Sequence, residues 1–485
     1  MARIAVIGAG MGAMATAARL AVAGHQVTVY ERGATYGGAV GRYEREGFAF
    51  DTGPGLLHLP AVYRDLFVKT GKRSLEDCVD MVQLDPAVRH VLPEHGIDVT
   101  LPGASRGGVA AALDEAFGRG AGERWNTVLG RARDAWDATR RPLLEEPLRP
   151  DWQVLGNDPY PARRKSGLLR RRTPALKEIA DRELGGALGE LLTGLVAEYG
   201  VDPRSAPGAA TVLPYMEQTF GSWYVRGGMR ALATAVYERC RERKVAFVFG
   251  AEVREVLVRD GRAAGLLLAD GSEAAADSVV CGIDPGRLPA GSLPWPPDAV
   301  PARGGLSGTS RFTLFLALRG ARPEGTAHRT RLFSRGTACD LTVLRPDDPA
   351  TRPDDGHEAV TVQAVCAPHG AVDWTAPSVA GPHAEKLLEA ASLVVPRLRE
   401  RLLWHEVRTP VDVEAATGAV GGSVPLPALA GAGGRLLYPA NTTAVPGLYL
   451  AGGWAHPGGG LPHAGMTGAL VAGLIVEGAE FRGSQ

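Results

Sequence analysis

The sequence lacks the residue patterns that define several classes of protein. Its five cysteines form no CxxC pair and stand at no ligand spacing with histidine, and neither HExxH nor GxSxG occurs. We therefore expect no metal site, no disulfide framework and no serine-hydrolase nucleophile. Isolated thiols of this kind are typically reduced and mostly buried. They are Cys78, Cys240, Cys281, Cys339 and Cys366.

An excess of charge and long apolar runs are also missing. The 53 Lys and Arg residues equal the 53 Asp and Glu residues, whereas binding of nucleic acid needs a basic excess or a strongly basic face. No window reaches about 18 uninterrupted apolar residues, so no transmembrane helix is predicted. Because Ile4 already belongs to the first apolar strand, we expect no cleaved leader and a cytoplasmic protein without a nucleic-acid partner.

The chain begins with a strand, a glycine-rich turn and a helix of small residues. Residues 4–7 are apolar, residues 14–23 form the predicted helix, and a second apolar run covers residues 26–30. The turn before the helix consists of Gly8, Ala9, Gly10, Met11, Gly12 and Ala13. This order of elements is typical of the first unit of a dinucleotide-binding fold.

The small residues of this turn have physical roles in binding a dinucleotide. Gly8 allows the tight turn, Gly10 lets the backbone approach a pyrophosphate, and Ala13 stands where a small residue packs helix against strand. The phosphates lie at the helix N-terminus, whose free N–H groups and dipole favour anions. Glu31 follows the second strand at roughly the 20-residue spacing of the carboxylate that binds a ribose hydroxyl. Such a carboxylate repels a 2′-phosphate, so a dinucleotide without one is predicted.

Two motifs downstream distinguish a flavin from a nicotinamide. Gly37 and Gly38 come soon after the acid, and residues 47–54 are GFAFDTGP. Here the chain resembles the FAD-dependent amine oxidase and phytoene desaturase superfamily, and most of all its phytoene desaturase branch. The resemblance implies that FAD is the cofactor and that Gly38 approaches its diphosphate.

The same resemblance assigns further residues to the flavin site. Arg32 directly follows the ribose-binding acid, and Gly53 lies within the GFAFDTGP segment. Relatives usually carry Arg directly after the glycine pair, whereas this chain has Ala39 there and Arg42 three residues on. Arg42 is therefore the candidate for neutralising a phosphate. In relatives the residue that matches Val253 binds adenine through its backbone, so no side-chain chemistry is expected there.

A second glycine loop follows a buried strand near the end of the chain. The apolar residues 448–451 precede the loop, and a small, apolar helix is predicted for residues 463–476. A helix N-terminus at this place stabilises negative charge on a reduced flavin ring. The passage GLYLAGGWAHPGGGLP is similar to the C-terminal flavin motif of phytoene desaturases, so the resemblance covers nearly the whole chain. The residues assigned to the flavin site here are Gly452, Gly453, Gly460 and Leu461.

The same loop holds the candidates for catalysis. Trp454 departs from the small residue common in the family and is expected to close part of the space beside the flavin ring. His456 either holds the loop by hydrogen bonding, which is the favoured interpretation, or transfers a proton or positions substrate. His463, at the helix start, is a weaker candidate of the same kind.

The pattern of elements predicts an α/β fold combined with an α+β part. A discontinuous Rossmann-type FAD-binding domain is expected from residues 1–72, 222–284 and 410–485, which include strands at 245–249 and 278–281. A mixed-sheet substrate-binding domain is expected from residues 73–105 and 285–409, with an amphipathic helix at 383–403. The mostly helical residues 106–221 are predicted to form a lid subdomain.

The predicted function rests on the resemblance. It is FAD-dependent desaturation, with hydride transfer between flavin N5 and a lipophilic polyene or isoprenoid, as in carotenoid biosynthesis. No second GxGxx(G/A) turn occurs, so we expect no dedicated NAD(P)H domain. Two alternatives stay open. One is a secondary-metabolite oxidoreductase or cyclase for a polyene tetramate macrolactam or another polyketide, and the other is a non-catalytic flavin-binding assembly partner.

Residues 163–172 hold six cations around two leucines. The favoured interpretation is a solvated turn, because runs of like charge usually face water. The alternative is peripheral contact with an anionic membrane surface, the inner face for a cytoplasmic protein, where each cation contributes about 1 kcal/mol. No feature of the sequence specifies an oligomeric state.

Overall fold

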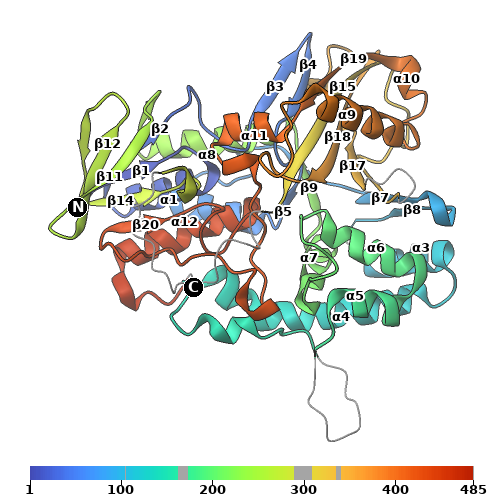
Figure 1. Ribbon diagram of the computed structural model, residues 1–485, viewed down its shortest axis with the longest axis horizontal. Helices are drawn as coiled ribbons and strands as arrows, with labels where there is room; N and C mark the ends of the chain where they lie inside the picture. Colours follow the sequence, from blue (N-terminus) through green and yellow to red (C-terminus); the bar gives the residue numbers. More distant parts are fainter. Residues whose placement is uncertain (104, 162–172, 289–307, 335–339, 484–485) are drawn as a thin grey trace, which may run out of the picture.

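The computed structural model of the chain describes residues 1–103, 105–161, 173–288, 308–334 and 340–483. The cation-rich segment 163–172 and Cys339 lie outside these described residues. In Figure 1 a sheet with helices α1, α8 and α12 occupies the left, a second sheet with α9 and α10 the upper right, and helices α3 to α7 the lower right.

A five-stranded parallel sheet forms the left part. Its strand order is β10-β2-β1-β14-β20, and every neighbouring pair is parallel. Strands from the start, the middle and the end of the chain therefore meet in one sheet, as the sequence predicted. They are β1 (Arg3–Ile7), β2 (Gln26–Glu31), β10 (Ala246–Phe249), β14 (Ser278–Cys281) and β20 (Leu448–Leu450).

Small residues let the helices of this part approach closely. A Cβ added at Gly468 of α12 would lie 2.8 Å from the backbone of Ala15 in α1, so only glycine allows this crossing. The antiparallel meander β11-β12-β13 attaches beside the sheet, with Asp260-Gly261 and Asp270-Gly271 at its turns. The bounds are α1 (Met11–Val22), α2 (Ala61–Thr70), α8 (Met229–Glu242), α12 (Leu461–Val476), β11 (Val253–Arg259), β12 (Arg262–Leu268) and β13 (Glu273–Ala275).

The second large sheet has seven strands in the order β19-β15-β18-β17-β16-β7-β8. Only β16 and β7 are parallel, so the sheet is mixed. One face packs its apolar residues, such as Phe312 and Leu314, against α9. The strands are β7 (Val88–Leu92), β8 (Ile97–Leu101), β15 (Ser310–Arg319), β16 (Arg329–Leu332), β17 (Leu341–Leu344), β18 (His357–Cys366) and β19 (Leu402–Arg408).

The helix expected at residues 383–403 is wrong at both ends. Helix α9 (Pro377–Ser392) begins earlier and stops before Pro396, and Arg397 has a left-handed φ of 53°. Only the short α10 (Leu398–Arg401) follows before the chain enters β19. Proline removes a backbone donor and blocks helix continuation, and this outweighed the periodic leucines.

The described part of the segment 106–221 is mostly helical, as predicted. Its apolar side chains form a core of their own around Trp125 and Leu191. The helices lie beneath the seven-stranded sheet in Figure 1. They are α3 (Arg106–Phe117), α4 (Ala121–Arg140), α5 (Leu176–Ile179), α6 (Gly186–Ala197) and α7 (Val212–Phe220).

Two small sheets cross the boundaries expected from the sequence. The hairpin β3 (Arg42–Arg45) and β4 (Phe48–Asp51) packs Phe48 and Phe50 against Phe315 of the seven-stranded sheet. A second sheet, β5-β9-β6, joins segments that we had assigned to different domains. Its strands are β5 (Leu57–His58), β6 (Met81–Gln83) and β9 (Ser222–Val225). The domain boundaries themselves stay a prediction.

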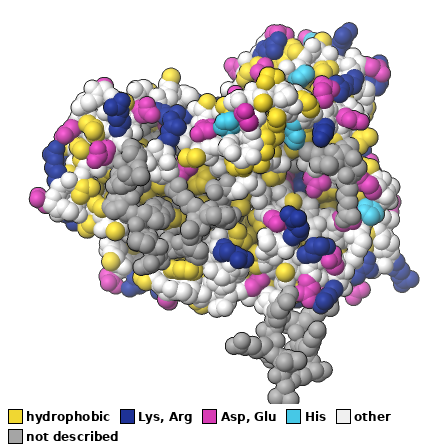
Figure 2. All heavy atoms as spheres, in the orientation of Figure 1, with side chains coloured by type: hydrophobic (Ala, Val, Ile, Leu, Met, Phe, Trp, Pro, Cys, Tyr) yellow, Lys and Arg dark blue, Asp and Glu magenta, His cyan; other side chains and the backbone are white. Residues whose placement is uncertain are grey.

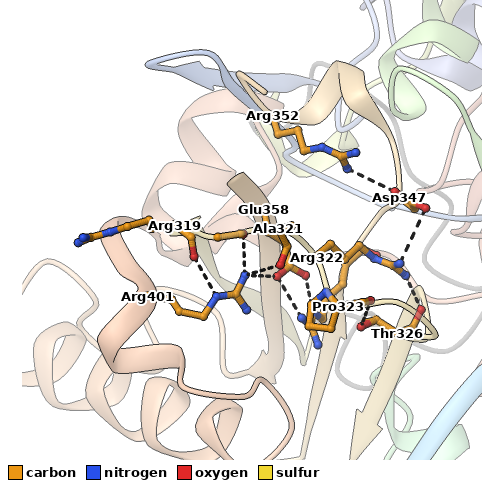
Figure 3. Close-up of polar contacts among 11 residues, drawn as sticks. Arg319, Ala321, Arg322, Pro323, Thr326, Asp347, Arg352, Glu358 and Arg401 are labelled. Atoms are coloured by element: carbon orange, nitrogen blue, oxygen red, sulfur yellow. Dashed lines mark hydrogen bonds and ion pairs between the residues drawn. The ribbon is translucent and has the colours of Figure 1, made fainter. Parts of the chain in front are cut away.

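Buried charges fix one end of the seven-stranded sheet. Glu358 of β18 is 1% exposed and accepts hydrogen bonds from Arg345, at 2.7 and 3.0 Å. It also accepts one from Arg401, at 2.8 Å (Figure 3). Arg401 also donates to the carbonyl oxygens of Arg319 and Gly320, each at 2.9 Å. The Glu358 carboxylate therefore ties the residue after β17 and the residue before β19 to β18, and Arg401 in turn ties the start of β19 to the end of β15.

The described surface carries charges of both signs. On the face drawn in Figure 2, Lys and Arg side chains are interspersed with Asp and Glu and form no single-sign field over the described residues. Among the same residues, no helix combines the length and the apolar character needed to cross a bilayer.

Candidate functional site

A large cavity lies between the parallel sheet and the seven-stranded sheet. Its volume is about 1730 Å³, above the roughly 300–1,000 Å³ of an ordinary small-molecule pocket. The cavity is lined by both glycine loops of the parallel sheet, by the polar face of the seven-stranded sheet and by residues of α7. Its size accommodates a dinucleotide and a second ligand together.

The first glycine turn opens onto this cavity. Gly8 has a φ of 86°, and its N–H donates a hydrogen bond to the Tyr30 carbonyl at 2.8 Å, which holds the turn against the end of β2. A Cβ added at Gly10 would meet nothing within 4 Å, whereas one added at Gly8 would lie 2.6 Å from Ile283. Gly10 therefore leaves space for a ligand, and Gly8 serves the turn.

Gly12 and Ala13 pack the start of α1 against other loops. A Cβ at Gly12 would lie 2.7 Å from Cα of Gly452 and 2.9 Å from the carbonyl oxygen of Ala464. A Cβ at Gly282, after β14, would lie 2.7 Å from Cβ of Ala13. The N-terminal and C-terminal glycine motifs thus touch each other through backbone, which no Cβ would permit.

Glu31 is positioned by backbone donors at the end of β2. Its Oε2 accepts a hydrogen bond from the Ala9 N–H and its Oε1 one from the Gly33 N–H, both at 2.7 Å. The Ala251 N–H donates to the Glu31 carbonyl at 2.9 Å, which brings the segment that begins with Val253 beside the acid. Glu31, Arg32 and Val253 all line the cavity.

The two predicted arginines are held by protein groups. Arg32 donates to the Ala415 carbonyl at 2.5 Å. Arg42 donates to the Glu44 carboxylate and to the Gly227 carbonyl, both at 2.6 Å. Both residues line the cavity, but the contacts of Arg42 tie β3 to the segment before α8 and leave it less free to neutralise a phosphate.

Arg230 was missed by the sequence analysis. From the first turn of α8 it donates to the Thr35 hydroxyl at 2.6 Å and to the Tyr36 carbonyl, and its guanidinium lies 4.1 Å from the Tyr36 ring. A Cβ at Gly37 would lie 2.8 Å from its Nη1. Arg230 therefore holds the loop that carries Gly38. Its only sequence signal was its position directly after Gly227, Gly228 and Met229.

The C-terminal loop completes this side of the cavity. Gly452, with a φ of 82°, and Gly460, with a φ of 95°, adopt left-handed conformations that favour glycine. Gly53 faces the same space from after β4, where a Cβ would lie 2.1 Å from the Ala39 carbonyl oxygen. The predicted residues of this loop that line the cavity are Gly452, Gly453, Trp454, Gly460 and Leu461.

The two histidines differ in placement. His456 does not line the cavity, and its Nε2 lies 2.9 Å from the Glu146 carbonyl oxygen. His463 does line it, at the first turn of α12. Burial lowers the pKa of each imidazole to about 4, so both are neutral near pH 7. The geometry favours the loop-holding interpretation of His456.

These residues fit FAD. The open space at Gly10, the acid at the end of β2 and two helix N-termini, of α1 and α12, facing one cavity match the needs of a pyrophosphate, a ribose and an electron-rich ring. No group of three or more metal-ligating side chains occurs among the described residues.

Comparison with known proteins agrees with this assignment. Residues 14–476 match the family described as flavin containing amine oxidoreductase. The 4,4'-diapolycopene oxygenase of Methylomonas sp is 27% identical over 498 residues, covering 98% of each chain. The hydroxyneurosporene desaturase of Cereibacter sphaeroides is 30% identical over 509 residues, covering 98% of this chain and 97% of that protein.

A solved structure shares the fold. The oxidoreductase from Methanosarcina mazei superposes with a TM-score of 0.63 at 18% identity, covering 96% of this chain and 98% of that one. The chain belongs to the flavin-containing amine oxidoreductase family, with relatives in its carotenoid desaturase branch. It is an FAD-dependent oxidoreductase, and the non-catalytic alternative is set aside.

Proposed function

We propose that the protein desaturates a lipophilic polyene or isoprenoid substrate. The observation that carries this proposal is that the flavin motifs and the second sheet line one and the same large cavity. When bound, FAD supplies the hydride acceptor, N5. The chain itself binds the substrate, orients its reacting carbon and excludes water.

Different parts of the chain around the cavity are suited to bind the cofactor and the substrate. We propose that residues 1–72, 222–284 and 410–485 hold the cofactor, and that residues 73–105 and 285–409 hold the substrate. Residues 106–221 cover it, since Leu213 and Met216 of α7 present apolar side chains to the cavity. His58 also lines it, and because burial lowers the pKa of its imidazole, the neutral ring is a candidate for receiving the proton that leaves the second carbon. Trp454 narrows the space beside the C-terminal loop.

The test uses purified holoprotein under anaerobic conditions. Phytoene and diapophytoene dispersed in detergent should bleach the oxidised flavin absorbance and yield products with additional conjugated double bonds. Putrescine and other small amines serve as the comparison and should leave the absorbance unchanged. Bleaching by small amines alone would refute the proposal.

One observation favours a second candidate, an oxidoreductase that acts on a polyene of polyketide origin such as a tetramate macrolactam. The sheet face in the cavity is polar and carries several guanidinium groups, which a pure hydrocarbon does not require. Bleaching by an oxygenated polyene, but not by phytoene, would select this candidate.

A further inference from the structure

A row of polar side chains crosses the cavity face of the seven-stranded sheet. In the register of the strands, Arg408 pairs with Thr313, Thr313 with Gln363, Gln363 with Thr342, and Thr342 with Arg331. Residues directly opposite each other on neighbouring strands lie on the same side of a sheet. All five line the cavity, so the substrate side of the molecule has a polar wall.

One end of this wall is neutralised by acids from the helical segment. Arg329 donates to Glu217 at 2.9 Å and to Glu198, and Arg331 also pairs with Glu198. The Thr342 hydroxyl donates to Glu198 at 2.8 Å. These contacts tie the sheet to the helices α6 and α7. The acids neutralise the charges of Arg329 and Arg331, so a structural role explains these two arginines.

Arg311 has no such partner. It lies two residues before Thr313 on β15, on the same side of the strand, and lines the cavity. Its guanidinium donates only to carbonyl oxygens, that of Glu198 at 2.6 Å and that of Ser310 at 3.5 Å, and no carboxylate pairs with it among the described residues. Burial lowers its pKa to about 10, with the Cys366 thiol as the opposing influence, so it is charged at neutral pH.

Arg408 lies close to Arg311. It stands directly opposite Thr313, so the two arginines form a diagonal cross-strand pair, whose separation is typically about 7–8 Å. The Nε of Arg408 is buried without an acceptor among the described residues. Burial lowers the pKa of Arg408, and the charge of Asp412 opposes that shift. The Asp412 Oδ2 already accepts hydrogen bonds from the Thr409 N–H and hydroxyl at 2.7 and 2.8 Å.

We propose that Arg311 and Arg408 bind an anionic oxygen group, a carboxylate or an ionised enol, on an otherwise apolar substrate. Guanidinium groups bind planar oxyanions through paired, charge-assisted hydrogen bonds, and the pair has N–H donors to spare. This inference rests on the proposed function, since it names the polar part of the polyene that the cavity receives.

The test is a binding titration of the FAD-loaded protein with all-trans-retinoic acid and with its methyl ester. Binding is followed by the change in the flavin absorption spectrum. The wild-type protein should bind the acid at least tenfold more tightly than the ester. Arg311→Gln should remove that preference by weakening the binding of the acid and not that of the ester. Arg311→Lys should retain part of the preference. FAD content should be the same in every variant.

Arg204→Gln is the matched control. It removes the same charge from the cavity lining, but Arg204 is 84% exposed and pairs with Asp202, so it should behave as wild type. If Arg311→Gln does not fold, Arg408→Gln is the second variant. It should also weaken the binding of the acid and leave the binding of the ester unchanged.

Each contrary outcome is distinct. Equal affinity of the wild type for acid and ester would overturn the anion site and leave the proposed desaturation standing. Loss of FAD in Arg311→Gln would assign the guanidinium to the cofactor and overturn the inference as well. Binding of neither compound would overturn the polyene function together with the site.

Discussion

Gly10 offers a sharp test of the dinucleotide site, because glycine at this position serves the ligand and not the fold. Its φ of −72° is available to any residue, and a Cβ built there would meet nothing within 4 Å. Replacing a glycine N-cap with alanine slightly destabilises the helix, whereas the reduced entropy of the unfolded chain stabilises the folded protein, so the two effects largely cancel. We therefore expect Gly10→Ala to change the stability of the apoprotein by no more than about 1 kcal/mol.

The effect on FAD should be much larger. The added methyl group occupies the space through which the backbone approaches the pyrophosphate, so at least one charge-assisted hydrogen bond is lost. Such a bond contributes about 1.5–3 kcal/mol, which corresponds to roughly 10- to 150-fold weaker FAD binding. Titration of the apoprotein with FAD, followed by flavin fluorescence, measures the dissociation constant, and thermal unfolding of the apoprotein measures stability.

Two other glycines supply the controls. Gly12→Ala places a Cβ 2.7 Å from backbone of Gly452, so it should destabilise the apoprotein itself by about 1–3 kcal/mol. Gly130→Ala, inside α4 with nothing within 4 Å, should stabilise it by roughly 0.5–1 kcal/mol and leave FAD binding unchanged. Wild-type FAD affinity in Gly10→Ala, or an apoprotein as unstable as Gly12→Ala, would refute the reasoning.

Four further predictions follow from the same structure. Glu31→Ala should weaken FAD binding about tenfold or more in the same titration, since the ribose loses a charged acceptor; unchanged affinity would exclude that role. Glu358→Gln should lower the free energy of unfolding in urea by about 3–5 kcal/mol, because the buried guanidinium of Arg345 and the partly buried one of Arg401 lose their carboxylate; a loss below about 1 kcal/mol would contradict this. His456 and His463 have folded-state pKa values of about 4, below the unfolded value of 6.5, so the stability gained by burying them neutral is present above pH 6.5 and is lost as pH falls towards 4. His456→Gln should therefore make the free energy of unfolding fall less steeply between pH 6.5 and pH 4. The same pH dependence in His456→Gln and wild type would contradict this prediction. Replacing residues 170–172 with Ser should reduce sedimentation with anionic vesicles at low salt if that segment contacts membrane, and equal sedimentation would leave it as a solvated turn.

The parallel sheet could be predicted from sequence because its signals are local. An apolar run, a small-residue turn and a helix follow one another within a few dozen residues at each end of the chain, and an acid closes the first unit. The strands β1, β2, β10, β14 and β20 appear where these patterns indicated. Even so, the clash that a Cβ at Gly12 would make with Gly452 involves the two ends of the chain and had no local signal.

The substrate side was harder to predict because its features arise from register. Thr313 and Gln363 lie within the mostly apolar runs 312–318 and 359–365, and nothing in either run indicates which residues of the other strands stand opposite. Arg408 lies just after a stretch that we had assigned to a helix, and Pro396 ended that helix early. A polar row across five strands exists only once the pairing of the strands is known.

The charge of this polar wall restricts what can occupy the cavity. A purely hydrocarbon ligand packed against Arg311 would strip water from a guanidinium that has no carboxylate among the described residues, and an unpaired buried ion costs several kcal/mol. Such a ligand must therefore bind elsewhere along the cavity or leave water at Arg311. An oxygenated, anionic ligand meets no such penalty, because it replaces the lost water with charge-assisted hydrogen bonds. We therefore expect the acidic oxygen group of a bound substrate to lie at Arg311 and Arg408 and its hydrocarbon part to lie elsewhere in the cavity, which the comparison of acid with ester tests.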